Sequence, residues 1–374
     1  MTLSTDKAST SAKNANGGRS PRKPKPASAS RPSTIRDVAA AAGVSSATVS
    51  RVLAGNYPVA AETKERVMAA VESLNYVMNV HAQALAGNAI GPVALVIDNI
   101  LGASLAHIAA GVEQESALHS RISLICATHG DRVREDELVR LMRQQRAAAV
   151  VLVGGAVADD AYHARITEYA KALDAVGSRL VLCGRPTPPP GTPATIVEYD
   201  NRGGAFHATS YLLTAGHRRI LYLGGVPGFS ANEERHAGYL DALRAHGVPY
   251  AEELDTSGDF DRPAGYLRTQ EAIRSGLDFT AIFASADMVA VGAAAALQDE
   301  GVKVPDEVSL IGFDDIPMAA ELTPALTTVR VPYEELGRTG VRLALEHREG
   351  RSRSSEHVIL STQLVVRDTV RRLD

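Results

Sequence analysis

The sequence predicts two kinds of structure in one chain: a small all-α unit near the N-terminus and a larger α/β core. Residues 34–78 contain three short stretches whose apolar residues recur at helical spacing. After residue 91, short apolar runs alternate with amphipathic segments, a pattern typical of parallel strands covered by helices on both faces. The chain of 374 residues exceeds one ordinary domain of about 100 to 200 residues, so we expect two doubly wound lobes.

Composition argues against a membrane protein. The longest apolar runs, such as 147–156, are shorter than the roughly 20 residues that a membrane-spanning helix needs, and the N-terminus lacks an apolar signal core. We therefore expect a cytoplasmic protein. Cys126 and Cys183 occur in apolar, strand-like contexts, which favours buried free thiols over a disulfide or a metal pair. We expect neither a metal nor a cofactor.

Residues 1–33 differ in composition from the rest. Their basic residues outnumber a single acidic one, Asp6, and are Lys7, Lys13, Arg19, Arg22, Lys23, Lys25 and Arg31. Because the whole chain carries a net charge of −4, the remainder is acidic. Rich in Ser, Ala and Pro and without apolar periodicity, the tail is predicted to be disordered. It is either a solvated leader or a source of extra affinity for phosphates.

The first predicted helix lies within "TIRDVAAAAG", residues 34–43. Thr34 suits the N-cap, Asp37 stands three positions later, and Gly43 is a typical stop. Its apolar stripe consists of Ile35, Val38, Ala39 and Ala42.

Two further helices follow directly. Ser45 can cap the second helix, which Gly55 ends, and its apolar stripe consists of Val49, Val52 and Leu53. The third occupies "ETKERVMAAVESLNY", with Asn75 suited to the left-handed position after it. Its inward residues are Val67, Ala70, Val71 and Leu74. The three helices predict a compact bundle.

Two short helices joined through Gly43 fit a helix-turn-helix. In that motif the start of the second helix meets base edges, while hydroxyl groups hold phosphates. The residues suited to phosphates are Ser45, Thr48 and Ser50; those suited to the groove are Ser46, Ala47 and Arg51. Since the bundle carries roughly balanced charge, a protein-interaction bundle is the alternative.

The core shows strand and helix candidates in alternation. The predicted strands are 93–98, 122–128, 148–155, 179–184, 219–225, 281–285 and 308–315. The predicted helices between them include 104–119, 134–145, 203–215, 232–246 and 287–300.

Several ordered segments together resemble one known family. They are "TIRDVAAAAGVSSATVSRVLAGN", "NVHAQALAG", "DNRGGAFHATSYLLTAGHRRILYLGG", "ERHAGYLDAL", "GDF", "FASADMVAVGAAAAL", "GFDDI" and "TPALTTVRVPYEELG". In this order they resemble the lactose repressor (LacI/GalR) family of bacterial transcriptional regulators. The resemblance implies a homodimer that binds a palindromic operator in double-stranded DNA, most simply as a repressor, under the control of a small-molecule effector.

The resemblance also assigns roles in the helix-turn-helix. Ser46 and Ala47 match the variable base-reading positions, and Arg51 matches the arginine that reaches the major groove. Ala54 stands where the family usually has an asparagine that contacts the DNA backbone, and Asn56 is its candidate replacement. Thr34 joins the candidate DNA-binding residues.

The stretch "NVHAQALAG", residues 79–87, raises a separate question of stability. It reads as two turns of helix, yet isolated helices shorter than about 12 to 15 residues are marginal in water. In the family the equivalent segment is a hinge that becomes helical when two copies pair on DNA, and Leu85 matches the leucine that wedges into the minor groove. The other candidate DNA contacts there are Asn79, Ala82 and Gln83. A passive linker is the alternative.

The resemblance implies a core like the periplasmic sugar-binding proteins, in which two lobes close on a ligand. The predicted domains are 1–33 as tail, 34–78 as helix-turn-helix, 79–90 as hinge and 91–374 as core. We place the N-lobe at about 91–197 plus 325–353 and the C-lobe at about 198–324 plus 354–374.

Ligands of doubly wound sheets bind at the carboxyl ends of the strands, where Asp98, Asp287 and Asp314 are expected. By resemblance, Arg235 grips polar ligand groups, Phe260 stacks on the ligand and Asp314 accepts hydrogen bonds, a set that suits a sugar or nucleoside-like molecule. The structural alternatives are a surface arginine, a core phenylalanine and a helix-capping aspartate.

Two departures from the family affect the expected pocket. Ala286 replaces the usual asparagine, and Ala103, Ser104 and Leu105 stand where the family usually has a proline and two aromatic residues. These changes favour an effector that is bulkier or less hydroxylated than a simple sugar, with the absence of any effector as the alternative. Ser104 joins the candidate effector-binding residues.

Enzyme motifs are lacking in the sequence. It has no phosphate-loop spacing, no HExxH among its 11 histidines and no GxSxG. A solute-binding receptor without gene control is the main alternative to a regulator, but it has no use for residues 34–87. The C-terminal "VVRDTVRRLD" lacks the apolar heptads that would build a tetramer, so a dimer is expected.

Overall fold

A computed structural model describes residues 33–54, 58–76, 91–100, 102–348 and 356–373. The chain divides into two compact units, Met1–Asn88 and Ala89–Asp374, and each is described by itself. The predicted tail up to residue 32, Asn56 and the hinge 79–90 lie outside the described residues. No helix in the described part of the chain is long and apolar enough to cross a membrane.

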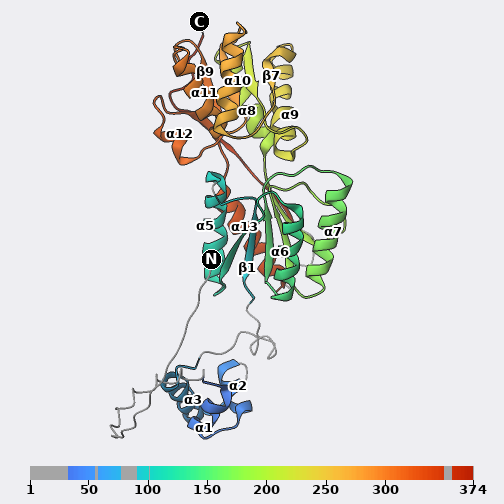
Figure 1. Ribbon diagram of the computed structural model, residues 1–374, viewed down its shortest axis with the longest axis vertical. Helices are drawn as coiled ribbons and strands as arrows, with labels where there is room; N and C mark the ends of the chain where they lie inside the picture. Colours follow the sequence, from blue (N-terminus) through green and yellow to red (C-terminus); the bar gives the residue numbers. More distant parts are fainter. Residues whose placement is uncertain (1–32, 55–57, 77–90, 101, 349–355, 374) are drawn as a thin grey trace, which may run out of the picture. The chain divides into compact units, whose positions relative to one another are not determined.

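The first unit is the predicted bundle of three helices (Figure 1). They are α1 (Ile35–Ala42), α2 (Ser46–Ala54) and α3 (Ala61–Ser73). The chain turns after α1 at Gly43, with φ of +65°, and after α3 at Asn75, with φ of +44°, as the sequence predicted. The buried residues shared by the three helices are Val38, Ala39, Ala42, Val49, Val52, Val67 and Ala70.

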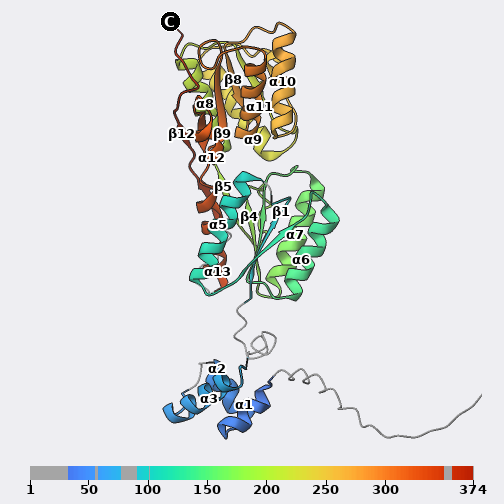
Figure 2. The ribbon, with the colours of Figure 1, turned by 60° about the vertical axis from the view of Figure 1, so that its left-hand side comes forward.

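The N-lobe of the second unit contains a six-stranded sheet in the order β11-β5-β4-β3-β1-β2, and all its pairs are parallel. Its strands are β1 (Val93–Ile97), β2 (Ser123–Ala127), β3 (Ala149–Val153), β4 (Arg179–Cys183), β5 (Ala194–Tyr199) and β11 (His357–Leu360). One face packs on α5 (Ala103–Leu118) and α13 (Tyr333–Arg348), and the other on α6 (Arg132–Gln144) and α7 (Asp160–Asp174), as Figure 2 shows.

The C-lobe repeats this architecture with the strand order β12-β10-β9-β8-β6-β7. Its strands are β6 (Ile220–Leu223), β7 (Asp255–Thr256), β8 (Ala281–Ala284), β9 (Ser309–Asp314), β10 (Thr327–Arg330) and β12 (Gln363–Val365). Its helices are α8 (Asn201–Thr214), α9 (Ser230–Ala245), the 3-10 turn η1 (Glu252–Leu254), α10 (Arg262–Arg274), α11 (Asp287–Asp299) and α12 (Pro317–Glu321). Helices α8 and α9 cover one face, and α10 and α11 cover the other.

The central strands are buried on both faces, which explains their unbroken apolar sequences. Every residue of β1, β3 and β4 is buried. Helices α5 and α13, which are far apart in sequence, approach closely because Gly111 faces the main chain of α13. A Cβ atom at Gly111 would lie 1.9 Å from the Glu334 carbonyl oxygen.

The predicted lobe boundaries differ from the observed sheets at two crossings. Strand β10, which we had placed in the N-lobe, pairs with β9 of the C-lobe, and β11, which we had placed in the C-lobe, pairs with β5 of the N-lobe. The chain therefore passes from one lobe to the other later than expected: it returns to the N-lobe after Arg330 and enters the C-lobe again after Leu360. Strand β12 pairs antiparallel with β10 in a sheet predicted to be parallel. Strands of three or four residues, such as β10, β11 and β12, carry too little pattern in their sequence to reveal their partners.

Candidate functional site

Helix α2 presents its candidate DNA contacts on the side opposite the bundle core. Ala47 and Arg51 are exposed and stand one turn apart, whereas Val49 is fully buried. Ser46 and Ser50 are half-buried beside them. The helix therefore offers the predicted groove-facing residues to a partner without loss of its apolar contacts.

Hydroxyl groups gather at the start of α2. The Ser45 hydroxyl oxygen accepts a hydrogen bond from the Thr48 main-chain N–H at 3.1 Å and lies 2.9 Å from the Thr48 hydroxyl oxygen. Ser45 is thus the N-cap that the sequence predicted. At α1, the Thr34 N–H and hydroxyl both donate to the Asp37 carboxylate at 2.7 Å. These bonds fix the beginnings of the two helices.

A cavity of about 270 Å³ lies between the lobes of the second unit, at the carboxyl ends of their strands. Five of the six residues predicted for the effector line it: Asp98, Ser104, Arg235, Phe260 and Asp314. The N-lobe contributes the loops after β1, β3 and β4 and the start of α5. The C-lobe contributes the start of α9 and the segments before α10 and α11 and after β9.

Arg235 is the centre of the C-lobe wall and is 3% exposed. Its guanidinium donates to the Asn201 side-chain oxygen at 2.8 Å and to the Ser285 carbonyl, and it stacks over the Phe313 ring with Cζ 3.9 Å from the centroid. It also pairs with the Asp314 carboxylate at 3.3 Å. The arginine is therefore held rigidly with its charge directed at Asp314.

Two tyrosines connect this pair to the segments that cross between the lobes. The Tyr333 hydroxyl donates to Asp314 at 2.7 Å, and Arg235 donates to the Tyr199 hydroxyl oxygen at 3.4 Å. The two rings meet edge to face, with centroids 5.7 Å apart. Tyr199 ends β5 and Tyr333 begins α13, so both tyrosines stand where the chain passes from one lobe to the other.

Burial and charge shift the pKa values of this network. Burial raises the pKa of Asp314, against the opposing effect of Arg235 and the Tyr333 hydroxyl. Burial is the largest single effect on the pKa of Arg235 and lowers it, but the Asp314 carboxylate and the neighbouring tyrosines together raise it further, and the net shift is upward. For Tyr333, burial and then the Asp314 charge raise the pKa well above its usual value. The arginine is thus charged and both tyrosines are neutral hydrogen-bonding groups at neutral pH.

The aromatic ring of Phe260 depends on a glycine beneath it. A Cβ atom at Gly225, just after β6, would lie 1.9 Å from Phe260 Cζ. Phe260 is half-buried and lines the cavity, as expected of a ring that stacks on a ligand. The Phe260 ring can therefore occupy this position only because Gly225 has no side chain.

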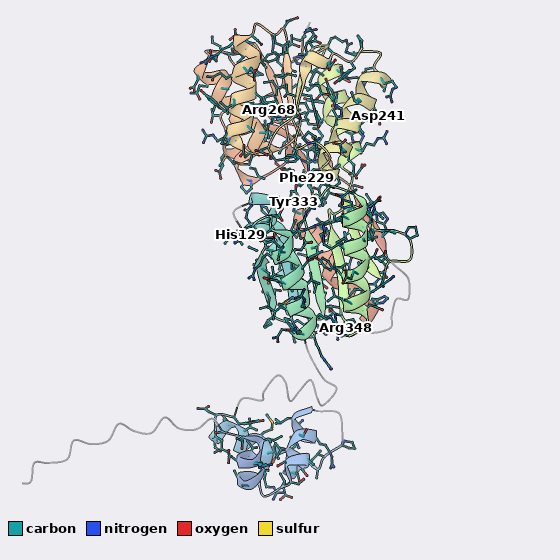
Figure 3. The ribbon with its side chains drawn as sticks, turned by 45° about the vertical axis from the view of Figure 1, so that its right-hand side comes forward. His129, Phe229, Asp241, Arg268, Tyr333 and Arg348 are labelled. Carbon is teal, nitrogen blue, oxygen red and sulfur yellow. The ribbon has the colours of Figure 1, made fainter. Side chains whose placement is uncertain are left out.

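Phe229 closes the cleft from the C-lobe side. Phe229 and Val157 of the N-lobe form an isolated antiparallel β-bridge, and the Ser230 N–H donates to the Ala156 carbonyl at 3.1 Å. Phe229 and Tyr333 both lie where the two lobes meet (Figure 3). Main-chain contacts thus join the lobes in addition to the crossing segments.

The structure places Asp287 outside the lining of the cleft. Its carboxylate is fully buried and accepts hydrogen bonds from the Thr328 hydroxyl at 2.5 Å and the Ile316 N–H at 2.9 Å. Burial and the nearby Asp314 charge raise its pKa well above the usual value. Asp287 supports the turn that carries Asp314, a position that the sequence prediction did not distinguish from the cleft itself.

Three aromatic residues of the lining were not predicted from the sequence: Tyr199, Phe229 and Tyr333. Tyr333 belongs to the quoted "TPALTTVRVPYEELG", yet nothing in that segment indicates a side chain at the cleft. Tyr199 ends the run "ATIVEY", whose apolar residues could have indicated a strand leading to the cleft.

Comparison with protein families gives two matches. The model of "Bacterial regulatory proteins, lacI family" matches residues 34–79, and that of "Periplasmic binding protein-like domain" matches residues 209–370. Among curated relatives, the HTH-type transcriptional regulator GalS of Salmonella typhimurium is 35% identical and is aligned over 85% of this chain and 90% of its own. The HTH-type transcriptional regulator CelR of Thermobifida fusca is 33% identical, over 90% of this chain and 98% of its own.

Solved structures agree with these matches. A complex of the transcriptional regulator CelR with cellobiose is 30% identical, covers 91% of this chain and 100% of its own, and has a TM-score of 0.66. The Lac repressor dimer bound to operator and the anti-inducer ONPF is 26% identical with the same coverage and a TM-score of 0.79. The chain therefore belongs to the lacI family of bacterial regulatory proteins and is a DNA-binding transcriptional regulator rather than an enzyme.

Proposed function

We propose that this regulator is a repressor that binds a palindromic operator as a homodimer, in the cytoplasm, and that a sugar or related metabolite in the cleft changes its operator affinity. The observation that carries the proposal is the cleft itself. Buried Arg235 and partly buried Asp314 stand with the Phe260 ring at the carboxyl edge of the C-lobe sheet, and Asp98 and Ser104 of the N-lobe line the same cavity. Donor, acceptor and aromatic face together suit a hydroxylated ring.

The same residues offer a route from ligand to lobe movement. A ligand that bonds to Arg235 or Asp314 competes with Tyr199 and Tyr333, which lie at two of the crossing segments. Loss or gain of those bonds changes the relative stability of two lobe arrangements, as domain closure requires. Whether the effector releases the operator or strengthens its binding depends on which arrangement it favours.

Exposed apolar side chains support the homodimer. On the N-lobe they surround the edge strand β2 and the end of α5: Leu118 is 78% exposed, Ile122 69% and Ile125 56%. On the C-lobe, Leu267 is 62% exposed and Met318 42%. Exposed apolar groups of this size are typical of surfaces that a partner covers.

For the DNA, we assign base contacts to Ser46, Ala47 and Arg51. The phosphate contacts assigned are Thr34, Ser45, Thr48 and Ser50. The remaining assignments rest on the family resemblance alone, because their residues lie outside the described part of the chain: Asn56, Asn79, Ala82, Gln83 and the wedge Leu85. If Leu85 is the wedge, Leu85→Ala weakens specific operator binding and leaves effector binding unchanged.

A gel-shift assay with genomic fragments tests the proposal. We expect a specific, salt-sensitive complex, and a sugar that changes its affinity by about 5- to 150-fold, the usual range of allosteric coupling. If sugars bind but no fragment forms a specific complex, the protein is a solute-binding receptor. If a specific complex forms but no metabolite alters its affinity, the proposed control by an effector is wrong.

A further inference from the structure

The two lobes share one architecture, so their outer edges, where strands begin and helices end, can be compared directly. Strands run from each outer edge toward the cleft, and the helices that follow them run back. The chain enters the core at the outer edge of the N-lobe, because Gly91 and Pro92 directly precede β1. In Figure 3, Tyr333 marks the cleft end of α13 and Arg348 marks its outer end.

Three basic residues lie along the last part of α6 at the outer edge of the N-lobe, and we call them the α6 arginines: Arg140, Arg143 and Arg146. All three are exposed, and none forms a hydrogen bond or an ion pair with another residue of the described chain. Attraction to the helix end favours a basic residue in the last turn, as at Arg143, but Arg140 stands one turn earlier.

Arginines at the ends of C-lobe helices are paired instead. Arg244, in the last turn of α9, pairs with Asp241 at 2.9 Å. Arg274, in the last turn of α10, pairs with Glu300 at 2.8 Å. The same architecture therefore carries neutralised charge at one outer edge and free positive charge at the other.

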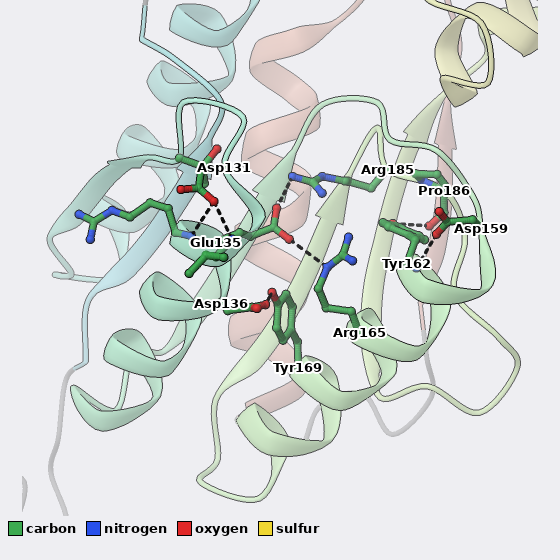
Figure 4. Close-up of polar contacts among 12 residues, drawn as sticks. Asp131, Glu135, Asp136, Asp159, Tyr162, Arg165, Tyr169, Arg185 and Pro186 are labelled. Carbon is green, nitrogen blue, oxygen red and sulfur yellow. Dashed lines mark hydrogen bonds and ion pairs between the residues drawn. The ribbon is translucent and has the colours of Figure 1, made fainter.

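Arginines nearer the cleft in the N-lobe are paired as well. Figure 4 shows Glu135 of α6 between Arg165 and Arg185, with N···O distances of 3.6 and 2.9 Å. Arg134, in the first turn of α6, pairs with Glu137 at 3.3 Å. Helix α6 thus has paired charges toward the cleft and unpaired positive charges, within the described residues, toward the outer edge.

An array of exposed, unpaired guanidinium groups suits a polyanion, and DNA is the polyanion that this regulator binds. The end of α6 lies directly beside the point of chain entry, since a Cβ atom at Gly91 would lie 2.1 Å from the Arg146 carbonyl oxygen. Residues 77–90 connect this point with the described part of the helix-turn-helix unit, and a chain of that length spans at most about 50 Å. DNA held by the first unit is therefore kept at high effective concentration around the α6 arginines.

We propose that the α6 arginines form a second, sequence-independent DNA contact, which binds phosphates outside the segment read by α2. Each arginine donates N–H hydrogen bonds to a phosphate and releases the counterions of that phosphate. The contact raises the affinity for any duplex long enough to reach it and leaves discrimination among sequences to α2. It therefore adds to the contacts assigned to the helix-turn-helix and the hinge.

Fluorescence anisotropy of the full chain over a series of salt concentrations tests this contact on two duplexes. One duplex ends at the operator, and the other extends by about one helical turn, roughly 10 base pairs, at each end. On the longer duplex, the triple variant Arg140→Gln, Arg143→Gln and Arg146→Gln should make the slope of log K against log salt shallower by about 2 to 3 per protomer, because each phosphate contact contributes about 0.9. On the shorter duplex the slope should change little.

The matched control removes the same charge from the outer edge of the C-lobe. Lys303, Arg371 and Arg372 are exposed there, close to the start of β9. Their triple replacement by glutamine should keep the original slope. Replacement of the α6 arginines by lysine should also keep most of it, since lysine retains the charge. If the α6 triple variant fails to fold in urea denaturation, Arg146→Gln alone, beyond the end of α6, should make the slope shallower by about 1 per protomer.

The outcomes separate this contact from operator recognition. An unchanged slope in the α6 variant would overturn the contact, and an equal loss in the C-lobe control would show that net charge governs the affinity instead. A random-sequence duplex of the longer length should show the same loss in the α6 variant, even if no fragment forms a specific complex. The absence of a specific complex counts against the operator alone.

Discussion

Helix α2 carries its candidate DNA contacts on an exposed helix face, whereas the cleft collects its candidate effector contacts from two lobes around a buried arginine. Arg51 reaches out from a helix whose apolar side is already packed against the bundle. Arg235, by contrast, is 3% exposed and bonds to four neighbours in the described chain: Asn201, Ser285, Tyr199 and Asp314.

Because of this contrast, substitutions in the two regions should affect binding affinity and folding stability differently. A substitution on the face of α2 should change DNA affinity alone, because no packed group loses a partner. A substitution in the cleft should change ligand affinity and the free energy of unfolding together, because the same bonds serve both. The four predictions below test that distinction.

The largest effect is expected from Arg235→Ala. Removal of the guanidinium leaves the Asp314 carboxylate buried without its counter-charge, which should lower the free energy of unfolding by about 3 to 5 kcal/mol. Urea denaturation measures the loss, and calorimetry should show no sugar binding. The double variant Arg235→Met with Asp314→Asn should recover much of the stability but not the binding. A stable, ligand-binding Arg235→Ala protein would remove this residue from the site.

Arg51→Ala should act on DNA affinity only. Loss of a bidentate contact to guanine weakens specific binding by about 1 to 3 kcal/mol. Since Arg51 is exposed, the free energy of unfolding should stay within about 0.5 kcal/mol of the original value. Fluorescence anisotropy on operator and scrambled DNA measures the change.

Arg66→Ala on α3 is the control for Arg51→Ala, because it removes the same exposed charge from another helix. It should leave discrimination between the two DNA sequences unchanged. Equal losses in both variants would show that Arg51 contributes charge rather than base recognition.

Gly225→Ala should act through Phe260. The added methyl group occupies the place of the ring, which must leave its position at the cleft. Aromatic contacts contribute about 0.5 to 1.5 kcal/mol, so effector affinity should fall about 3- to 10-fold in calorimetry. Phe260→Ala should give a similar loss, and the double variant should add little to either. Fully additive losses would mean that the glycine and the ring act independently.

The smallest effect is expected from Asp287→Asn, because the amide oxygen can accept from the Ile316 N–H and the amide NH2 can donate to the Thr328 hydroxyl oxygen, as the OH of a protonated carboxyl group would. The folded-state pKa of Asp287 is raised, so its contribution to stability is present below its unfolded pKa, near the usual 3.8, and is lost as pH rises through the folded value. The advantage of the original protein over the variant should therefore shrink as pH increases from acid to neutral.

Urea denaturation at several pH values measures this difference, with Asp160→Asn at an exposed aspartate as control. Parallel stability curves for Asp287→Asn and the original chain would show that the carboxyl group has the same pKa in the folded and unfolded states.

The local part of the fold was predictable from the sequence. Helix α1 begins after Thr34 and turns at Gly43 as expected, since capping and left-handed turns depend on neighbouring residues. The buried central strands were also predictable, because their apolar residues follow one another in short unbroken runs. Strands β10 and β11 were assigned to the wrong lobes, because their pairing depends on residues far away in the chain.

The candidate site was predictable only in part. The resemblance to a known family indicated Arg235, Phe260 and Asp314, and all three line the cleft. It did not indicate Tyr199 or Tyr333, whose roles arise where β5 and α13 meet at the lobe junction. Asp287 was expected in the cleft but turns toward Thr328 and Ile316 instead.

By itself, the sequence determined the buried central strands, the N-caps of α1 and α2 and the turns at Gly43 and Asn75, because periodicity and capping act over a few residues. Only the tertiary structure decided which charges pair with one another. Glu135, Arg165 and Arg185 come from three separate segments of the N-lobe, and their ion pairs form only when those segments are packed together (Figure 4). Electrostatic and hydrogen-bonding environment depends on distance in space, which sequence separation does not specify.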